Sequence, residues 1–199
     1  MRIISTILIC IATFFILNRV IPTESEYQIY DSCIRLHVIA NSDSQSDQEL
    51  KLKVRDKLLE YVSGYDVNSK ETALLRLNED KTTLEKMARE VIAENGYSYD
   101  AKIEIGLENY PTREYEDFSL PAGEYTSVRV IIGEGNGQNW WCVLYPPLCT
   151  QAALSYDKDA CIEVGLSSGQ YDLITGANGR YKVKFKIVEM AAEIAGFDY

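Results

Sequence analysis

The sequence predicts an α+β domain in which helices pack on one face of an antiparallel sheet, preceded by an N-terminal apolar export or anchor segment. Three patterns support this: an apolar run at the start, helical-period apolar stripes in the first half, and period-two alternation in the second half. The 199 residues are 46% hydrophobic, which suits one globular domain. We expect a signal peptide or membrane anchor over residues 1–21, a linker over 22–32 and a single domain over 33–199.

The N-terminal stretch Ile3–Leu17 carries no charged side chain, follows Arg2 and precedes Arg19. A basic start followed by an apolar run is typical of a signal-peptide core or an N-terminal anchor. The run lacks a clear small-x-small cleavage site, and as far as Ile21 it is barely long enough to cross a bilayer. We therefore expect export, with cleavage or anchoring left open. A buried helix is less favoured because the run has no polar face.

The expected elements run strand, helices, strands, helix. The first strand covers Cys33–Ala40. The polar residues Asn41–Ser44 end it and supply N-cap residues for a helix that follows to about Val62, with Ser46 and Glu49 at capping-box spacing. A short helix over Lys70–Leu77 and a longer one, capped by Asp80 or Thr82 and ending at Asn95-Gly96, come next. Period-two strands are expected from Tyr99 to Leu107, over Tyr125–Ile132 and over Asn139–Leu144. Residues 155–180 read as a loop with a short helix, and Tyr181–Ala195 as a terminal helix entered by a short strand.

The glycine-rich segment Gly133–Gly137 (GEGNG) resembles a phosphate-binding loop only superficially, because a strand follows it instead of a helix. We therefore expect a plain hairpin turn between the last two strands.

The charge balance excludes some classes of protein. The chain has 20 basic and 30 acidic residues, and without Arg2 and Arg19 of the first 21 residues the net charge is −12. A nucleic-acid binder needs a basic face, so that class is disfavoured, and a partner with basic surface is preferred. The single histidine, His37, makes a His-rich zinc site or a His-based triad hard to build.

The sequence contains only weak signals for a catalytic or metal site. Neighbouring carboxylates in a predicted loop (Glu114, Glu116, Asp117) could serve a wall hydrolase, and Cys142 or Cys149 could form a dyad with His37. Acidic residues within 41–49 lack the glycine and terminal glutamate of a calcium loop, and helix capping explains them better. We expect no enzyme activity, no metal and no cofactor.

The cysteines outside the apolar run allow three pairings among Cys33, Cys142, Cys149 and Cys161. A local Cys142–Cys149 bridge around Pro146-Pro147 competes with two buried free thiols. Cys33 and Cys161 are candidates for a second bridge in addition to it. The adjacent Trp140 and Trp141 are expected on opposite faces of a strand, where the second ring is either covered by the fold or exposed for a partner.

Four sequence blocks resemble the stage II sporulation protein R family: Arg35–Asp56, Tyr110–Tyr115, Leu120–Cys149 and Val183–Met190. The similarity covers nearly all of the expected exported portion. The positions carried over by the resemblance, as partner-binding or family-motif residues, are Arg35, Asn41, Ser42, Asp43, Tyr110, Pro111, Arg113, Pro121, Gly123, Tyr125, Asn139, Trp140, Trp141, Pro146 and Pro147, with the Cys142–Cys149 pair.

The resemblance implies an exported signalling protein of endospore formation, made in the forespore and released or anchored in the space between the two sporulation membranes. Its partner would be a membrane-embedded aspartic protease in the mother-cell membrane, which then processes an early mother-cell pro-sigma factor. No nucleic acid or small-molecule substrate is expected. An extracytoplasmic wall hydrolase and an envelope structural or interaction protein are the alternatives.

Overall fold

The computed structural model describes residues 4–7, 9–13, 29–115, 118–148, 162 and 166–175. The chain divides into two compact units. The sheet unit comprises Tyr30–Glu108 and Glu124–Ser167, and the hairpin unit comprises Met1–Ile29, Asn109–Gly123 and Ser168–Tyr199. Both units combine segments far apart in the sequence, and the expected single domain over 33–199 stays a prediction.

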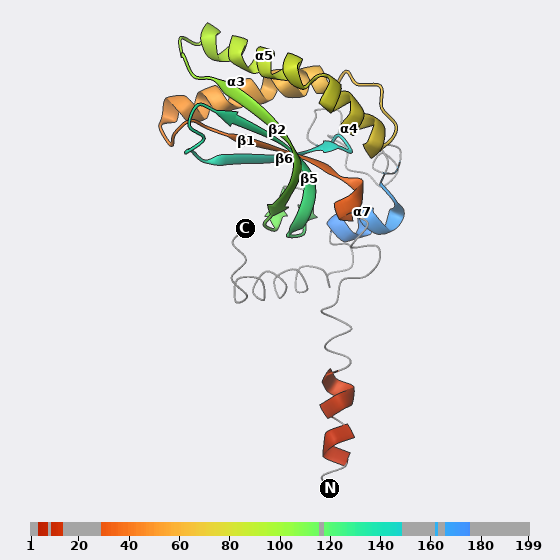
Figure 1. The fold of residues 1–199 in the computed structure, drawn as a ribbon. Helices are drawn as coiled ribbons and strands as arrows, with labels where there is room; N and C mark the ends of the chain where they lie inside the picture. The colour runs from red at the N-terminus through yellow and green to blue at the C-terminus, as the bar shows by residue number, and fades with distance from the viewer. Residues whose placement is uncertain are drawn as a thin grey trace. The chain divides into compact units, whose positions relative to one another are not determined.

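The sheet unit is a mixed sheet with helices over one face, as Figure 1 shows for the neighbouring α3 and α5. Its elements are β1 (Ile34–Ile39), α3 (Gln45–Val62), α4 (Lys70–Glu79), α5 (Lys81–Glu94), β2 (Ala101–Tyr110), β5 (Gly123–Ile132) and β6 (Asn139–Tyr145). The strand order is β2-β5-β1-β6, with β1 parallel to β5 and antiparallel to β6. The α+β class and these elements match the prediction, whereas the purely antiparallel sheet was wrong.

The position of β1 explains why the sheet is mixed and not purely antiparallel. Five of its six residues are buried, including Arg35 and His37, so the strand is covered on both faces and suits the middle of a sheet. It therefore lies between β5 and β6, and the predicted plain hairpin at Gly133–Gly137 does not form. The connection between β5 and β6 instead has to cross the end of β1.

The hydrophobic core lies between the sheet and the helices. Alternate residues of β1, such as Leu36 and Val38, meet the apolar stripe of α3, which includes Leu50, Val54 and Leu58. The same cluster contains Leu77 of α4, Leu84, Ala88 and Ile92 of α5, Ile103 of β2 and Val130 of β5.

The helix ends follow the sequence with two corrections. Ser44, one of the residues 41–44 predicted to supply the N-cap, caps α3, and its hydroxyl accepts the Asp47 N–H; the capping-box spacing of Ser46 and Glu49 is not used. Asp80 stands at the N-cap of α5 but makes no side-chain capping bond; its carboxylate accepts hydrogen bonds from the hydroxyls of Tyr61 and Tyr65. Gly96, with φ of +82°, follows α5 as predicted.

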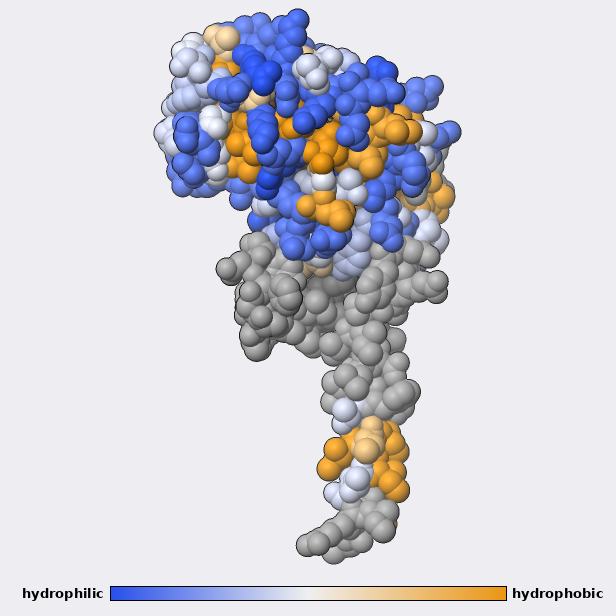
Figure 2. All heavy atoms as spheres, viewed as in Figure 1, coloured by the Kyte–Doolittle hydropathy of each residue, from blue (hydrophilic) through white to orange (hydrophobic). Residues whose placement is uncertain are grey.

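The hairpin unit contains a small two-stranded sheet, β3 (Arg113–Glu114) with β4 (Ser119–Leu120), and the helix α7 (Ser168–Ile174). Sequence reasoning assigned a loop to the first of these segments. Residues 4–7 and 9–13 are helical and display exposed isoleucines, which form hydrophobic surface in Figure 2. Among the described residues, no helix is both long and apolar enough to cross a bilayer. The expected helix over Tyr181–Ala195 lies outside the described residues.

Candidate functional site

A polar loop cluster forms where β1 ends. The loop after β1, Ala40–Asp43, is crossed by the β5–β6 connection, Gly133–Gln138, which we call the crossing loop. Backbone bonds join Gly137 N to Ala40 O at 2.9 Å and Asn136 N to Asn41 O at 3.2 Å. The Asn41 side-chain oxygen accepts the Glu134 N–H, and Asp43 accepts the Gln138 N–H. Asn41 and Asp43 therefore hold the crossing loop, a role distinct from capping α3.

The Asp47 carboxylate binds two side chains of this cluster. Its Oδ2 accepts hydrogen bonds from Asn41 Nδ2 at 2.9 Å and from Ser42 Oγ at 2.5 Å. The residue is only 3% exposed, and burial acts to raise its pKa, but the hydrogen bonds outweigh it and hold the pKa of Asp47 below its ordinary value. The acidic residues here therefore bind protein donors, and within the described ranges no group of three or more His, Cys, Asp or Glu side chains could hold a metal ion.

Two glycines of the crossing loop are explained by the close approach of the loop that follows β1. A Cβ on Gly137 would lie 2.3 Å from Ser42 O, and one on Gly133 would lie 2.2 Å from Asn41 Oδ1. Gly133 also has φ of +56°, a conformation that side chains disfavour. The glycine-rich segment serves the strand crossing and does not form a phosphate-binding loop.

A second polar cluster lies on the sheet face opposite the helices. Glu108 of β2 accepts hydrogen bonds from His37 Nδ1 at 2.8 Å and Ser127 Oγ at 2.6 Å. Arg129 pairs with Glu104 and lies 3.9 Å from Glu108. Burial acts to raise the pKa of Glu108, but these donors and the nearby positive charge leave it lowered. The cluster ties β2, β5 and β1 together across the sheet.

This second cluster contains a serine, a histidine and a carboxylate, yet it lacks the geometry of a nucleophilic triad. The serine and the histidine both bind the carboxylate, so the histidine does not take the serine proton. The proposed Cys142–His37 dyad is also wrong, because Cys142 belongs to the helix-side core while His37 stacks on Trp141 of the other face. Cys149 lies outside the described residues.

The two tryptophans of β6 point to opposite faces, as predicted. The Arg55 guanidinium of α3 lies 4.6 Å from the Trp140 ring centre, whereas Trp141 stacks on His37 with 3.7 Å between ring centres. Each ring therefore has an intramolecular partner, and both residues are half-buried. Asn139, which precedes them, is exposed.

Arg35 is fully buried on β1. Its guanidinium lies 4.9 Å from the ring centre of Tyr125 on β5, and Tyr30 packs edge-on against the same ring. These two positions from the family blocks thus contact one another inside the sheet unit.

The motif residues of the hairpin unit surround β3 and β4. Tyr110 is fully buried, Pro121 is buried, and Pro111, Arg113 and Gly123 are half-buried. The Thr112 hydroxyl accepts the Ala122 N–H, and Tyr115 stacks on Phe118 with 4.4 Å between ring centres. Glu114 is exposed on β3, while Glu116 and Asp117 lie outside the described residues, so the carboxylate set proposed for a hydrolase is not assembled within the part described.

The cysteine predictions resolve in part. Cys33 is a free, fully buried thiol, and burial raises its pKa to about 12, so the second bridge, Cys33–Cys161, is wrong. Cys142 is buried, but Cys149 and Cys161 lie outside the described residues, and the Cys142–Cys149 bridge stays a prediction.

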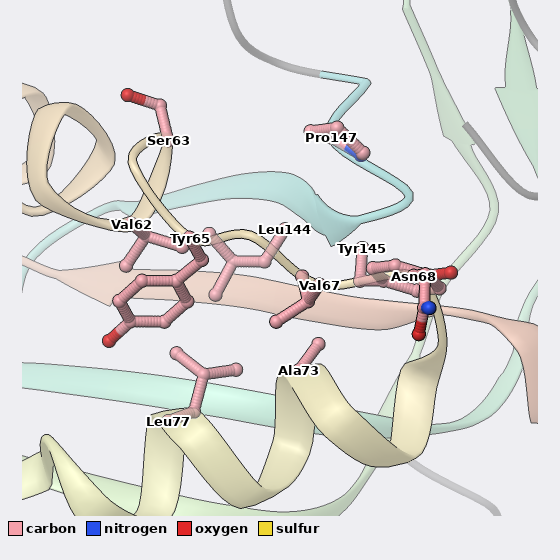
Figure 3. Close-up of a pocket in the computed structure, with 10 residues that line it drawn as sticks. All are labelled: Val62, Ser63, Tyr65, Val67, Asn68, Ala73, Leu77, Leu144, Tyr145 and Pro147. Atoms are coloured by element: carbon pink, nitrogen blue, oxygen red, sulfur yellow. The ribbon is translucent and has the colours of Figure 1, made fainter. Parts of the chain in front are cut away.

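A pocket of about 280 Å³ opens between the α3–α4 connection, α4 and the end of β6 (Figure 3). Tyr65, Leu77 and Leu144 point toward its centre, and Asn68 and Pro147 stand at its rim, just after the cis peptide between Tyr145 and Pro146. Its lining contains no charged side chain among the described residues, so it offers an apolar surface without acid–base groups.

Taken together, fold and clusters define an α+β protein whose described polar groups brace the fold and bind one another. A family model described as stage II sporulation protein R (spore_II_R) matches residues 30–155. A protein named stage II sporulation protein R from Bacillus subtilis (strain 168) is 34% identical over 157 residues, which cover 72% of this chain and 70% of that protein. The chain belongs to the stage II sporulation protein R family, and this supports a role in sporulation. No solved structure matches it.

Sequence reasoning missed three residues of these clusters as site residues: Asp47, Glu108 and Ser127. Asp47 follows the N-cap by three positions, a spacing that could have drawn notice to it. Glu108 and Ser127 carry no comparable signal, because their contacts depend on the order of the strands.

Proposed function

We propose that this chain is an exported developmental signalling protein that activates a membrane-embedded aspartic protease of the mother-cell membrane. The protease then processes an early mother-cell pro-sigma factor during endospore formation. The observation that carries the proposal is family membership through residues 30–155, which span β1 to β6.

The arrangement of polar groups supports a protein that acts by binding. His37, the sole histidine, is held by Glu108 and stacked on Trp141, and the hydroxyl of Ser127 in the same cluster donates to Glu108. Asp43 and Asp47 likewise bind protein groups. These contacts favour a signal recognised by an enzyme over a wall hydrolase.

The N-terminal segment supports the proposed location between the two sporulation membranes. Its helical residues expose Ile4, Ile7, Ile9 and Ile11 at 64%, 53%, 62% and 47%, a surface that water disfavours and an export apparatus or membrane would accept. Release after export and N-terminal anchoring are both compatible with activation from outside the membrane.

The proposal is tested by coexpressing the full chain, the protease and the pro-sigma factor in a bacterium that lacks all three, with processing followed by immunoblot. We expect processing only when the chain is present. The double variant Ile7→Asp/Ile9→Asp puts charges into the apolar run and should abolish processing by blocking export. The matched control Leu75→Asp changes an exposed leucine of α4 and should leave processing intact.

Absence of processing with the wild-type chain contradicts activation of the protease. Full processing with the double variant contradicts the requirement for export. Deletion of the gene in the source organism gives a second test, and normal sigma-factor processing in the deleted strain overturns the proposal.

A further inference from the structure

The strand β2 is an outer strand of the described sheet, bonded to β5 on one side only. Its middle is open to solvent: Gly106 is exposed, a Cβ added there would meet nothing within 4 Å, and Leu107 is 70% exposed. An outer strand with an exposed apolar side chain is a template for pairing with another strand.

The direction of the backbone groups follows from one hydrogen bond. The Ile103 N–H donates to Glu85 Oε1 of α5 at 3.0 Å, so it points away from β5. Because backbone groups alternate along a strand, the N–H and C=O groups of Ile105 and Leu107 point to the same open side. The glutamate thus covers the start of this edge, while the part that follows is uncovered by the described residues.

The sequence of β2 is complementary to itself in one antiparallel register. With Ile105 opposite Ile105 of a second copy, Lys102 of each copy lies opposite Glu108 of the other, and Ile103 lies opposite Leu107. Shifting this register by two residues in one direction places Glu104 opposite Glu108 of the other copy. Shifting it by two residues in the other direction places the two Glu104 residues opposite each other. Both shifted registers bring like charges together.

The side chains that would form the charge pairs, Lys102 and Glu108, are both accessible to a second copy. Lys102 is 66% exposed, and its ammonium group bonds the Glu104 carboxylate of its own strand at 2.6 Å, so an exposed cation lies at the position that faces Glu108 of the other copy. Glu108 retains partial exposure, at 18% of its side chain, and keeps its bonds to His37 and Ser127. On the other face of the strand, Ile103, Ile105 and Leu107 form one apolar row.

We propose that two copies of this chain associate through β2, antiparallel about a two-fold axis at Ile105, to form one continuous sheet. The two Ile105 residues exchange a pair of backbone hydrogen bonds, and Leu107 donates to Ile103 of the other copy. The dimer covers the open edge and brings two charge pairs together. This association is independent of the proposed signalling function and is tested without the protease.

The first test measures sedimentation equilibrium of the full chain in density-matched detergent. We expect the wild type to dimerise and Leu107→Lys to dimerise at least about tenfold more weakly, because each added charge faces the apolar side chain of Ile103 in the other copy. The matched control Leu75→Lys alters a leucine that is 65% exposed on α4 and should dimerise like the wild type. Circular dichroism of each variant checks that it is folded.

A monomeric wild type, or a folded Leu107→Lys that dimerises as strongly as the wild type, overturns the proposal. A wild-type monomer that binds another protein through β2 assigns this edge to a different occupant and also overturns it.

The second test checks the register with a short bis-maleimide crosslinker. Positions 105 of the two copies should lie about 5.5 Å apart between Cα atoms, whereas positions 102 should lie about 20 Å apart. We expect Ile105→Cys to give a crosslinked dimer beyond the wild-type background and Lys102→Cys to give none. Equal crosslinking of both variants contradicts the register.

Discussion

The strands β1 and β2 have similar sequence patterns but differ in burial and in their position in the sheet. Both alternate apolar and polar residues in sequence, yet β1 is buried on both faces between β5 and β6, while β2 stands outside with Leu107 open to solvent. Around β1 the polar side chains are committed to the fold through Asn41, Asp43 and Asp47. The difference teaches that family-motif residues near β1 brace the molecule, whereas β2 presents exposed side chains at an outer position of the described sheet.

The largest expected effect comes from comparing two glycine substitutions, one in the crossing loop beside the end of β1 and one on β2. Gly137→Ala places a Cβ 2.3 Å from the backbone oxygen of Ser42, so the crossing loop must shift. We expect a loss of about 2–3 kcal/mol in the free energy of unfolding, measured by urea denaturation. Gly106→Ala on β2 meets open space and should change stability by less than about 0.5 kcal/mol. Equal losses at both positions would contradict the distinction.

A second substitution tests the polar cluster under the crossing loop. Asp47→Ala removes the acceptor shared by Asn41 and Ser42 and leaves their donors without it. We expect a loss of about 2 kcal/mol in the free energy of unfolding. Asp56→Ala, whose carboxylate is 63% exposed beside Arg55, serves as control and should cost about 0.5 kcal/mol or less. A matching loss in the control would mean that burial of Asp47 is unimportant.

The pH dependence of stability gives a second test of the role of Asp47. The pKa of Asp47 is lower in the folded protein than its ordinary value, so its stabilisation is present above the unfolded pKa of about 4 and is lost as the pH falls through the folded pKa. Asp47→Asn should therefore be less stable than wild type at pH 7, and the gap should narrow on acidification. Urea denaturation from pH 7 down to pH 3 measures it, and a gap that widens in acid contradicts the assignment.

The smallest expected effect concerns the contact between α3 and β6. Arg55→Met removes the guanidinium 4.6 Å from the Trp140 ring centre but keeps an apolar side chain of similar length. We expect a loss of about 0.5–1 kcal/mol and a change in tryptophan fluorescence. Lys57→Met, on the exposed part of the same helix, should alter neither. An unchanged emission spectrum in Arg55→Met would show that the contact does not form in solution.

Most helices and strands of the sheet unit could be predicted from sequence because their signals are local. The helix over Gln45–Val62 follows from an apolar stripe, and the end at Asn95-Gly96 follows from the backbone freedom of glycine. The opposite faces of Trp140 and Trp141 follow from the two-residue period of a strand.

The candidate sites were predictable only as sets of residues. The resemblance named Arg35, Tyr125, Asn41 and Asp43, but not which residues each of them contacts. Asn41 meets the Glu134 N–H across 93 positions of sequence, and His37 meets Glu108 across 71. Periodicity reports which face a residue occupies and says nothing of which strand lies beside it.

By itself, the sequence determined the α+β class, the helices and strands of the sheet unit, the apolar N-terminal segment and the family resemblance. Tertiary structure alone decided that β1 enters between β5 and β6, that Gly133 and Gly137 serve a strand crossing, and that β2 is an outer strand of the sheet formed by the described residues. The physical reason is that element type depends on neighbours a few residues away, whereas strand order depends on burying a strand that is covered on both faces.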